Sequence, residues 1–508
     1  MSATFLDMDL KHHLICLMLL IALANAVELS SEAKNSLVQK LHLNNLEERR
    51  ARLQHLGELL ANGTTAQKSA ILSTDQQVLS DSAGAEPGIE EINESGGIAK
   101  YLFQSDIHLS DEQLTRMEQS LIQAAGARSK RQVAKYAVLW PDNRVYYFFD
   151  PVMSTRMRTV TQKALNYVQA RTCVSFFLNA TAPNRVRIIS DTGCWSSIGM
   201  VGGEQSLSLG NGCDVVGLAA HEFTHTLGVY HMQMRDDRDD YLTIDLTNVP
   251  AGMQGNFAKL STDESINYNP YEYGSVMHYG SNTLATTGNS MIPKDPLYLR
   301  TIGSRVISFY DIKTINDHYG CNALCGAGSA VCANGGEPNP RNCAACNCPG
   351  GYGGALCNQR PGGALCNQRP WGITRGYIVT SDLVASPPAG CGEALVATNL
   401  WKVKKFTFGN AQDKTLRDNF MLCNHWISAP AGKKIQIRVT FMNALKCGVG
   451  CRVNSIEPKV REDKRLINPR ICCADALYKV HTSALNPTPV VSYNRLLTTT
   501  FTFHYRYI

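Results

Sequence analysis

The chain has 508 residues, a net charge of +6 and 44% apolar residues. This length favours two to four domains, and the apolar content is ample for packed cores. The mild charge gives no indication of a nucleic-acid partner, because no basic stripe is interleaved with aromatic residues. Of the eighteen cysteines, all but Cys16 lie between Cys173 and Cys473, which indicates an oxidising compartment.

An apolar run at residues 14–23 follows Lys11 and precedes the small residues Ala24-Asn25-Ala26. The run is short for a bilayer span and ends in a cleavage-like sequence, so it predicts a signal peptide over residues 1–26. An uncleaved anchor is the alternative. No later run approaches the length of a membrane span, and we therefore expect a secreted chain without a membrane anchor.

Residues 27–131 contain no cysteine, and leucines at helical spacing predict one amphipathic helix over 32–61. The basic run at 128–131 is typical of sites cut by secretory-pathway convertases, with a basic surface patch as the alternative. It lies where the cysteine-free part meets the cysteine-bearing part. We therefore expect a propeptide over 27–131 that a processing convertase removes between Arg131 and Gln132.

The sequence at residues 221–231 is His-Glu-Phe-Thr-His-Thr-Leu-Gly-Val-Tyr-His. His221 and His225 are four residues apart, so on a helix both imidazoles face the same way and can reach one metal ion. Glu222 stands beside the first histidine, where a carboxylate can accept a proton from metal-bound water.

Gly228 can adopt a left-handed backbone conformation that stops the helix. The chain can then turn back, so that His231 becomes a third ligand. The alternative is an ordinary helix with two surface histidines, but the added glycine and third histidine at fixed spacing argue against it.

This pattern resembles the metzincin zinc peptidases, and Ser275-Val276-Met277-His278-Tyr279 resembles the Met-turn of the astacin family. The resemblance implies one catalytic Zn²⁺ held by the three histidines, with Glu222 as general base. It places Met277 beneath the metal. It also makes Tyr279 a further zinc ligand that can swing away and donate a hydrogen bond to the oxyanion.

The resemblance covers residues 132–321 and implies an α+β metzincin zinc-peptidase domain. Alternation and periodicity predict strands near 146–149 and 186–189 and a helix near 156–170. Residues 193–199 resemble the family's strand above the cleft, an edge that would hold peptide substrate by strand addition. The implied disulfides are Cys173–Cys321 and Cys194–Cys213.

Phe103-Gln104-Ser105-Asp106 resembles the astacin latency motif Phe-x-Gly-Asp, which makes Asp106 the zinc ligand of the latent form. A carboxylate in the open coordination position would displace the catalytic water. Ser105 departs from the usual glycine and fits poorly if this position needs a positive φ. A plain surface acid is the alternative.

Met232 departs from the family's glutamate, which pairs with the new N-terminal ammonium after activation. A methionine cannot pair with a charge. One hypothesis is that Gln132 cyclises to pyroglutamate, which has no ammonium group to pair. The other hypothesis is that the new N-terminus is held less tightly after activation.

Residues 322–370 resemble an EGF-like module, and residues 391–508 resemble a CUB domain, an all-β sandwich. Nine residues, 353–361, are repeated without change at 362–370, which adds Cys366 and leaves an odd number of cysteines after the signal peptide. The EGF-like resemblance implies the disulfides Cys325–Cys343, Cys332–Cys346 and Cys348–Cys357. A zinc site at Cys343, Cys346 and Cys348 is the alternative.

The sandwich contains alternating strands at 435–441 and 500–505. The CUB-like resemblance implies a disulfide between Cys391 and Cys423, and the remaining cysteines are Cys447, Cys451, Cys472 and Cys473. The pairing of the last four cysteines is open, and no acidic calcium cluster is evident. Glycosylation acceptor sequences begin at Asn62, Asn93 and Asn179.

These observations predict a secreted zinc endopeptidase, made as a zymogen, that hydrolyses extracellular proteins. Its organisation resembles that of nematode astacins, with EGF-like and CUB-like modules behind the peptidase domain. The alternative is a catalytically inert extracellular binding protein that acts through those two modules.

Overall fold

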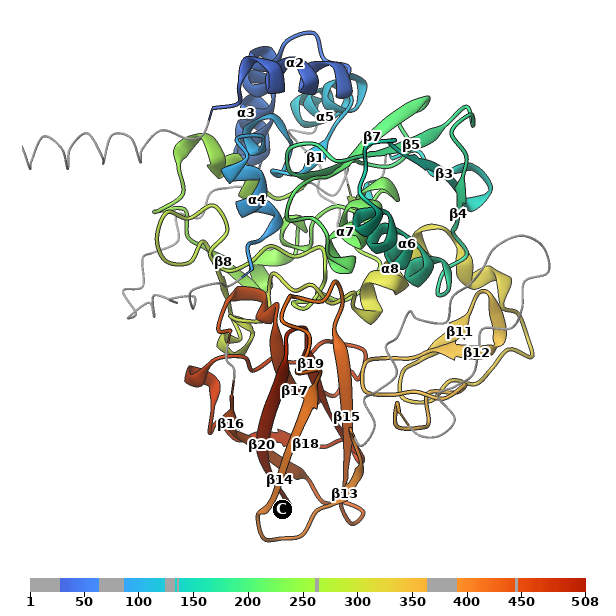
Figure 1. The fold of residues 1–508 in the computed structure, drawn as a ribbon, viewed down its shortest axis with the longest axis vertical. Coiled ribbons are helices and arrows are strands. Elements are labelled where there is room, and N and C mark those ends of the chain that lie inside the picture. Colours follow the sequence, from blue (N-terminus) through green and yellow to red (C-terminus); the bar gives the residue numbers. More distant parts are fainter. Residues whose placement is uncertain are drawn as a thin grey trace, which may run out of the picture.

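A computed structural model describes residues 28–63, 86–123, 133–134, 137–260, 265–362, 391–443 and 446–508. The chain forms an N-terminal region (28–123), a central domain (137–321), a disulfide module (322–362) and a C-terminal sandwich (391–508). Figure 1 shows the N-terminal helices at one end of the central domain and the sandwich at the other. The predicted signal peptide, the cleavage site at Arg131, Gln132 and Cys366 lie outside the described residues. No described helix is long and apolar enough to cross a membrane.

The central domain contributes five strands to a six-stranded sheet of order β1-β6-β7-β5-β3-β4, whose first strand, β1 (Ile107–His108), comes from the N-terminal region. Its own strands are β3 (Arg144–Phe149), β4 (Ser175–Leu178), β5 (Arg185–Ile189), β6 (Cys194–Ser197) and β7 (Glu204–Leu209). Neighbouring strands are parallel except for the antiparallel pair β6 and β7. The strands expected near 146–149 and 186–189 are thereby confirmed. Two short strands, β8 (Leu242–Ile244) and β10 (Met291–Pro293), pair separately.

The α-helices described in the central domain are α6 (Thr155–Gln169), α7 (Val216–Thr226) and α8 (Phe309–His318). The helix expected near 156–170 is α6, which buries Val160, Ala164 and Val168 on one face in the main core. α7 packs in the same core and is buried along its whole length. Because every residue of α7 is enclosed, its polar side chains need partners or a function.

The N-terminal region contains α2 (Ser31–Lys40), α3 (Leu46–Gly63), α4 (Ile89–Ser95), β1 (Ile107–His108) and α5 (Asp111–Gln123). The single helix expected over 32–61 is wrong, because the chain breaks between α2 and α3. His42 has a φ of 52° there, which no right-handed helix accommodates. Asn45 then caps α3, since its side-chain oxygen accepts hydrogen bonds from the backbone of Glu47 and Glu48.

The disulfide module carries the hairpin β11 (Glu337–Asn339) and β12 (Asn342–Asn347). Its three disulfides join Cys325 to Cys343, Cys332 to Cys346 and Cys348 to Cys357. These are the pairs that the EGF-like resemblance implies, so the sulfurs of Cys343, Cys346 and Cys348 are not available as a zinc site.

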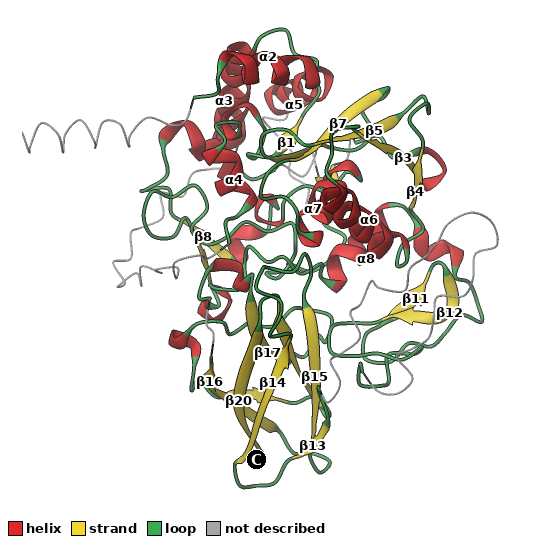
Figure 2. Ribbon diagram, viewed as in Figure 1, coloured by secondary structure: helices red, strands yellow, loops and turns green. Residues whose placement is uncertain are grey.

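Two four-stranded sheets form the C-terminal sandwich, with orders β13-β15-β19-β17 and β14-β20-β16-β18 (Figure 2). The strands are β13 (Ala394–Val396), β14 (Lys402–Gly409), β15 (Met421–Ser428), β16 (Ile435–Met442), β17 (Asn454–Pro458), β18 (His481–Ser483), β19 (Thr488–Asn494) and β20 (Thr498–Tyr507). The expected strands at 435–441 and 500–505 are β16 and β20. One core joins Ile427 and Val490 of the first sheet to Ile437 and Phe503 of the second.

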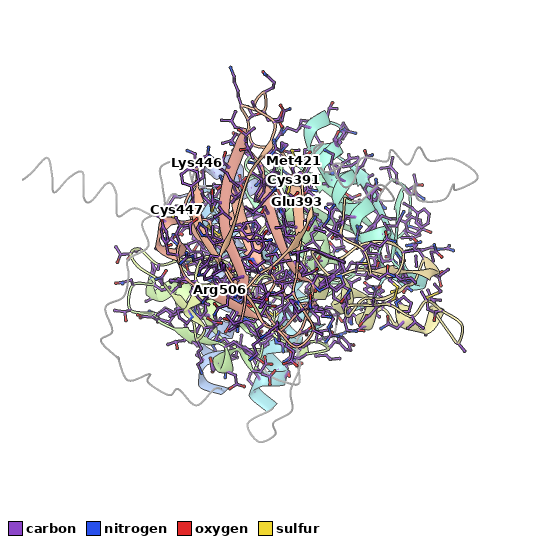
Figure 3. All side chains as sticks on the ribbon, turned by 90° about the horizontal axis from the view of Figure 1, so that it is seen from below. Cys391, Glu393, Met421, Lys446, Cys447 and Arg506 are labelled. Carbon is purple, nitrogen blue, oxygen red and sulfur yellow. A yellow bond between two sulfur atoms is a disulfide. The ribbon has the colours of Figure 1, made fainter. Side chains whose placement is uncertain are left out.

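Disulfides join Cys391 to Cys423, Cys447 to Cys473 and Cys451 to Cys472 in the sandwich. Figure 3 labels Cys391 and Cys447, which lie apart on the sandwich. The last two pairs settle the connectivity that the sequence leaves open. The remaining described disulfides, Cys173–Cys321 and Cys194–Cys213, belong to the central domain.

The sandwich packs directly against the central domain. The Tyr298 hydroxyl donates to the carbonyl of Ile467 at 3.1 Å, and the Glu272 carboxylate accepts from the amide of Ile467 at 3.0 Å. At Gly450 an added Cβ would lie 2.1 Å from the carbonyl oxygen of Gly303, so the two backbones are in close contact. These contacts hold the two parts in one arrangement.

The two central disulfides close loops of very different length, 148 and 19 residues. Loop-closure entropy predicts losses of about 5 kcal/mol for Cys173→Ala/Cys321→Ala and about 3 kcal/mol for Cys194→Ala/Cys213→Ala. Calorimetry of the central domain's unfolding transition measures both. Equal losses in the two double variants would contradict this account.

Candidate metal centre and active site

Helix α7 carries the first half of the candidate site. An apolar run from Val215 to Ala220 seats it in the core, and His221 and His225 follow one turn apart on the same face. The helix ends at Thr226, and Gly228 follows with a φ of 93°. A side chain is rarely tolerated at that φ, so the predicted role of this glycine is confirmed.

His231 completes a ring of three imidazoles. Its Nε2 lies 3.2 Å from the Nε2 of His221, which in turn lies 3.0 Å from the Nε2 of His225. The Nδ1 atoms point outward to oxygen acceptors at 2.7 to 2.8 Å: the carbonyls of Val276 and Val229 and the side chain of Gln104. Each Nδ1 therefore carries the proton, and the three Nε2 lone pairs face one another.

The carboxylate of Asp106 faces the same point from the N-terminal region. Its Oδ2 lies 3.1 Å from the Nε2 of His221 and 3.0 Å from that of His231, and its Oδ1 lies 3.7 Å from the Nε2 of His225. Burial raises the pKa of this carboxyl, but the imidazoles outweigh burial and hold its pKa well below the ordinary value. Burial also lowers the pKa of His231 to about 3 and that of His225, so both stay neutral, as metal ligands must.

These four side chains fit a tetrahedral zinc ion. Their ligand atoms lie within 4.8 Å of one another and all four residues are buried. Zinc bonds of 2.0–2.1 Å imply ligand–ligand distances of about 3.3 Å, close to the 3.0 to 3.2 Å that separate four of the six ligand pairs. Three imidazoles and one carboxylate are also ligands that zinc prefers among nitrogen and oxygen donors.

Glu222 lies beside this ring with both carboxylate oxygens buried and without a hydrogen-bond partner. Burial is the main reason that its pKa lies well above the ordinary value, and the charges of Asp106 and Glu90 raise that pKa further. A buried carboxyl group without hydrogen-bond partners destabilises the fold, and proteins keep such groups chiefly at functional sites. Sequence reasoning missed Glu90, because nothing local marks it as a residue that reaches the site.

Met277 and Tyr279 come from the turn at 275–279, which lies against the histidine ring. Met277 is buried with Val229 and Val276, and the carbonyl of Val276 orients His221. The hydroxyl of Tyr279 donates to the carbonyl of Gln104, and its ring centre lies 4.7 Å from that of His231.

Asp311, at the start of α8, supports this turn and was also missed from the sequence. Its carboxylate accepts hydrogen bonds from the hydroxyl of Ser275 at 2.5 Å and the amide of Val276 at 3.0 Å. Asp311 therefore positions the turn that orients the first histidine.

Strand β6 forms the edge of the central domain's own sheet, and β1 of the N-terminal region covers it. Ile107 pairs with Ser196 and His108 with Ser197 in parallel register. The amide of Ser196 also donates to the carbonyl of Asp106 at 3.0 Å. A strand in this position blocks main-chain pairing by any other peptide.

The structure contradicts the expected glycan at Asn93. This residue is fully buried, and its amide nitrogen donates to the carbonyls of Ser105 and Cys194. Its oxygen accepts from the amide of Cys194 at 2.8 Å. Asn93 thus ties the N-terminal region to β6, and a glycan would have no room. Asn179 is part-exposed, and its side-chain oxygen accepts from Thr181.

Gln104 and Ser105 have φ angles of 50° and 65°. This is the left-handed region, where glycine is favoured and other residues are strained by roughly 1–2 kcal/mol. The family's glycine thus has a physical reason, and the serine here works against the conformation that presents Asp106. The sequence motif assigns no role to Gln104, whereas in the structure its side-chain oxygen orients His231.

Met232 is buried in an apolar cluster with Leu242, Phe257 and Met291. Its amide donates to the carbonyl of Met277 at 2.8 Å. An apolar, packed side chain therefore stands where the family has a glutamate that pairs with a charge.

The astacin peptidase family matches residues 132–320. The chain is 43% identical over 425 residues to zinc metalloproteinase nas-32 of Caenorhabditis elegans, covering 82% of this chain and 60% of that protein. It is 33% identical over 463 residues to nas-31 of the same organism, covering 89% of this chain and 70% of that protein. Among solved structures it is similar to high choriolytic enzyme 1, a hatching enzyme zinc-protease from Oryzias latipes, with 30% sequence identity. The similarity covers 36% of this chain and 94% of that chain, with a TM-score of 0.34.

The chain therefore belongs to the astacin family, and its central domain is a zinc metalloendopeptidase domain with one catalytic zinc. The chain spans about 60% of the length of nas-32.

Ser105→Gly relieves the strain at φ 65° and is expected to stabilise the N-terminal region by about 1 kcal/mol. Ser110→Ala is the matched control, because its hydroxyl caps α5 by accepting from the amide of Gln113 at 3.1 Å. Loss of that cap should cost about 1 kcal/mol. Hydrogen exchange of α3 and α5 in the unprocessed chain measures both, and a destabilising Ser105→Gly would contradict the strain argument.

Proposed function

We propose that this protein is a secreted zinc endopeptidase made as a zymogen, in which residues 27–131 are the propeptide. One observation carries the proposal. The carboxylate of Asp106 enters the ring formed by His221, His225 and His231, beside the unpartnered carboxylate of Glu222. A reactive centre and the group that closes it therefore come from the two sides of the predicted cleavage site.

In the processed enzyme the three histidines hold the metal and Glu222 handles the proton. Bound zinc supplies a Lewis acid and lowers the pKa of a water molecule towards about 7. Glu222 accepts the proton of the attacking water and afterwards gives it to the leaving amine. Tyr279, freed from Gln104, donates a hydrogen bond to the carbonyl oxygen as its negative charge develops.

In the unprocessed chain the N-terminal region occupies each part of this machinery. Asp106 takes the fourth ligand position, and the carbonyl of Gln104 accepts from the hydroxyl of Tyr279. β1 pairs with β6, the edge that would hold the substrate main chain. Release at Arg131 would uncover the ligand position, the hydroxyl and the strand together.

The remaining assignments depend on the sequence and on disulfide chemistry. The disulfide module serves as an EGF-like module and the C-terminal sandwich as a CUB-like domain, and both travel with the enzyme into the extracellular space. Eight disulfides occur among the described residues, which suits an oxidising compartment. The substrates are extracellular proteins or peptides.

Activation at Arg131 leaves Gln132 as the first residue. A buried methionine at position 232 offers no carboxylate to a new ammonium group. Cyclisation of Gln132 to pyroglutamate removes that ammonium, and mass spectrometry of the processed N-terminus tests the idea. An uncyclised glutamine would refute it.

Glu222→Gln is expected to keep one zinc per chain and to lose turnover by at least about a hundredfold, because the general base is gone. His225→Gln should lose the zinc as well. The measurements are zinc content by mass spectrometry and cleavage of a quenched peptide by the processed protein, with and without a chelator.

Glu204→Gln is the matched control, since Glu204 lies on β7 and pairs with Arg185 rather than facing the metal site. It should retain both zinc and turnover. Normal turnover in Glu222→Gln would remove this residue from the mechanism. No turnover in correctly processed, zinc-loaded wild-type protein would refute the proposed function.

A further inference from the structure

Three buried arginines meet at the junction of the central domain and the C-terminal sandwich. Arg305 precedes α8 of the central domain, whereas Arg452 and Arg495 belong to the sandwich. Residues 86–91 of the N-terminal region lie on them. In Figure 1, α4, which begins at Ile89, lies between the N-terminal helices and the sandwich.

Each arginine holds a different part of that segment. Arg495 donates to both carboxylate oxygens of Glu86, at 2.5 and 3.2 Å. Arg452 donates to the main-chain carbonyl of Glu86 at 2.6 Å, and Arg305 donates to the carbonyl of Pro87. One side-chain carboxylate and two successive main-chain carbonyls are therefore recognised together.

The carboxylates that pair with these arginines all lie before the cleavage site. Among the described residues, Glu86 pairs with Arg495 and with Arg305, and Glu91 pairs with Arg452. The pKa of Arg305 is lowered to about 9, mainly by burial and in part by the other two guanidinium groups, while the charge of Glu86 opposes the shift. Removing the segment would leave three neighbouring cations without these carboxylates, and an anionic ligand would again offset their mutual repulsion.

The mature part of the chain holds two of the three arginines in place by itself. The Nε of Arg452 donates to the carbonyl of Gly303 at 3.1 Å. Arg495 donates to the carbonyls of Arg417 and Arg452 at 2.7 and 3.1 Å. Because these bonds do not involve the N-terminal region, Arg452 and Arg495 should keep their positions after it leaves and remain available to a new ligand.

The contacts define the chemistry of that ligand. A planar guanidinium binds a carboxylate through two parallel hydrogen bonds, as Arg495 does here. The donors of Arg452 and Arg305 face main-chain carbonyls, which a polysaccharide or a free anion lacks. The buried Nε of Arg305 has no hydrogen-bond partner and lies 3.9 Å from the Glu86 carboxylate, so it offers one more donor to the same site.

The segment also continues towards the reactive centre. Asn93, on the same helix α4, donates from its amide nitrogen to the carbonyls of Ser105 and Cys194 at 2.9 and 2.6 Å. Ser105 precedes Asp106, whose carboxylate faces the three histidines, and Cys194 begins β6. One short helix therefore connects the arginines with the metal site and its edge strand.

We propose that, after removal of the propeptide, Arg305, Arg452 and Arg495 form a binding site for an acidic segment of a polypeptide substrate. The site is shared by the peptidase domain and the sandwich. This inference rests on the proposed function, because the site opens only when residues up to Arg131 leave. It assigns the sandwich a part in choosing substrates with glutamate or aspartate near the scissile bond.

The direct test uses a fluorescent peptide with the sequence of residues 86–95 and the processed chain carrying Glu222→Gln, which prevents cleavage. Fluorescence anisotropy should show saturable binding that weakens with salt. Replacing Glu86 by Gln in the peptide should weaken binding at least about tenfold, since a charge-assisted pair is lost. This change cannot disturb the fold of the enzyme.

Arg495→Lys in the enzyme should weaken binding similarly, because lysine cannot bind both carboxylate oxygens in parallel. Arg506→Gln is the matched control; Arg506 lies on β20, donates to Gln436 and is labelled in Figure 3. It should bind the peptide as the parent does. No binding, or equal binding of the two peptides, would overturn the proposal.

Binding of a sulfated heparin fragment in place of the peptide would also overturn it and assign the arginines to polysaccharide. A second readout compares quenched substrates with and without the acidic decapeptide. The acidic substrate should have at least about a tenfold lower KM, and equal KM values would contradict the proposal. If the peptide binds but the wild-type enzyme shows no turnover, the proposed function is refuted, whereas the peptide-binding site is supported.

Discussion

The structure depends on one arrangement of charges and lone pairs: a buried carboxylate facing three imidazoles. His221, His225 and His231 each direct Nε2 inward because each Nδ1 is held by an oxygen acceptor. Four ligand atoms this close, enclosed by the core, are unfavourable without a cation among them. The position of Asp106 therefore joins folding of the N-terminal region to occupation of the metal site.

The central motif could be predicted from sequence because its geometry is local. His221 and His225 share a helix face, and Gly228 must turn the chain before His231 can return. The break at His42 could not be predicted, because the leucine spacing continues through it. The helix is interrupted by the backbone conformation of this one residue. Asn93 looked like an acceptor for a glycan, since a three-residue pattern carries no information on burial.

The other residues whose roles the sequence does not reveal have partners far away in the chain. Gln104 orients a histidine 127 positions later, and Glu86 meets Arg495 across 409 positions. No periodicity or spacing encodes such contacts. The same contacts explain why the N-terminal region touches both the peptidase domain and the sandwich. Asp106 contacts the histidine ring of the peptidase domain, and Glu86 contacts Arg495 of the sandwich.

The most direct test of this account is a crystal structure of the unprocessed chain with anomalous data at the zinc absorption edge. The account predicts one zinc peak bound by the Nε2 atoms of His221, His225 and His231 and by a carboxylate oxygen of Asp106. A zinc ion bound by the three histidines and water, with Asp106 elsewhere, would contradict the closing role of this carboxylate. A zinc ion outside the histidine ring would contradict the assignment of the metal centre itself.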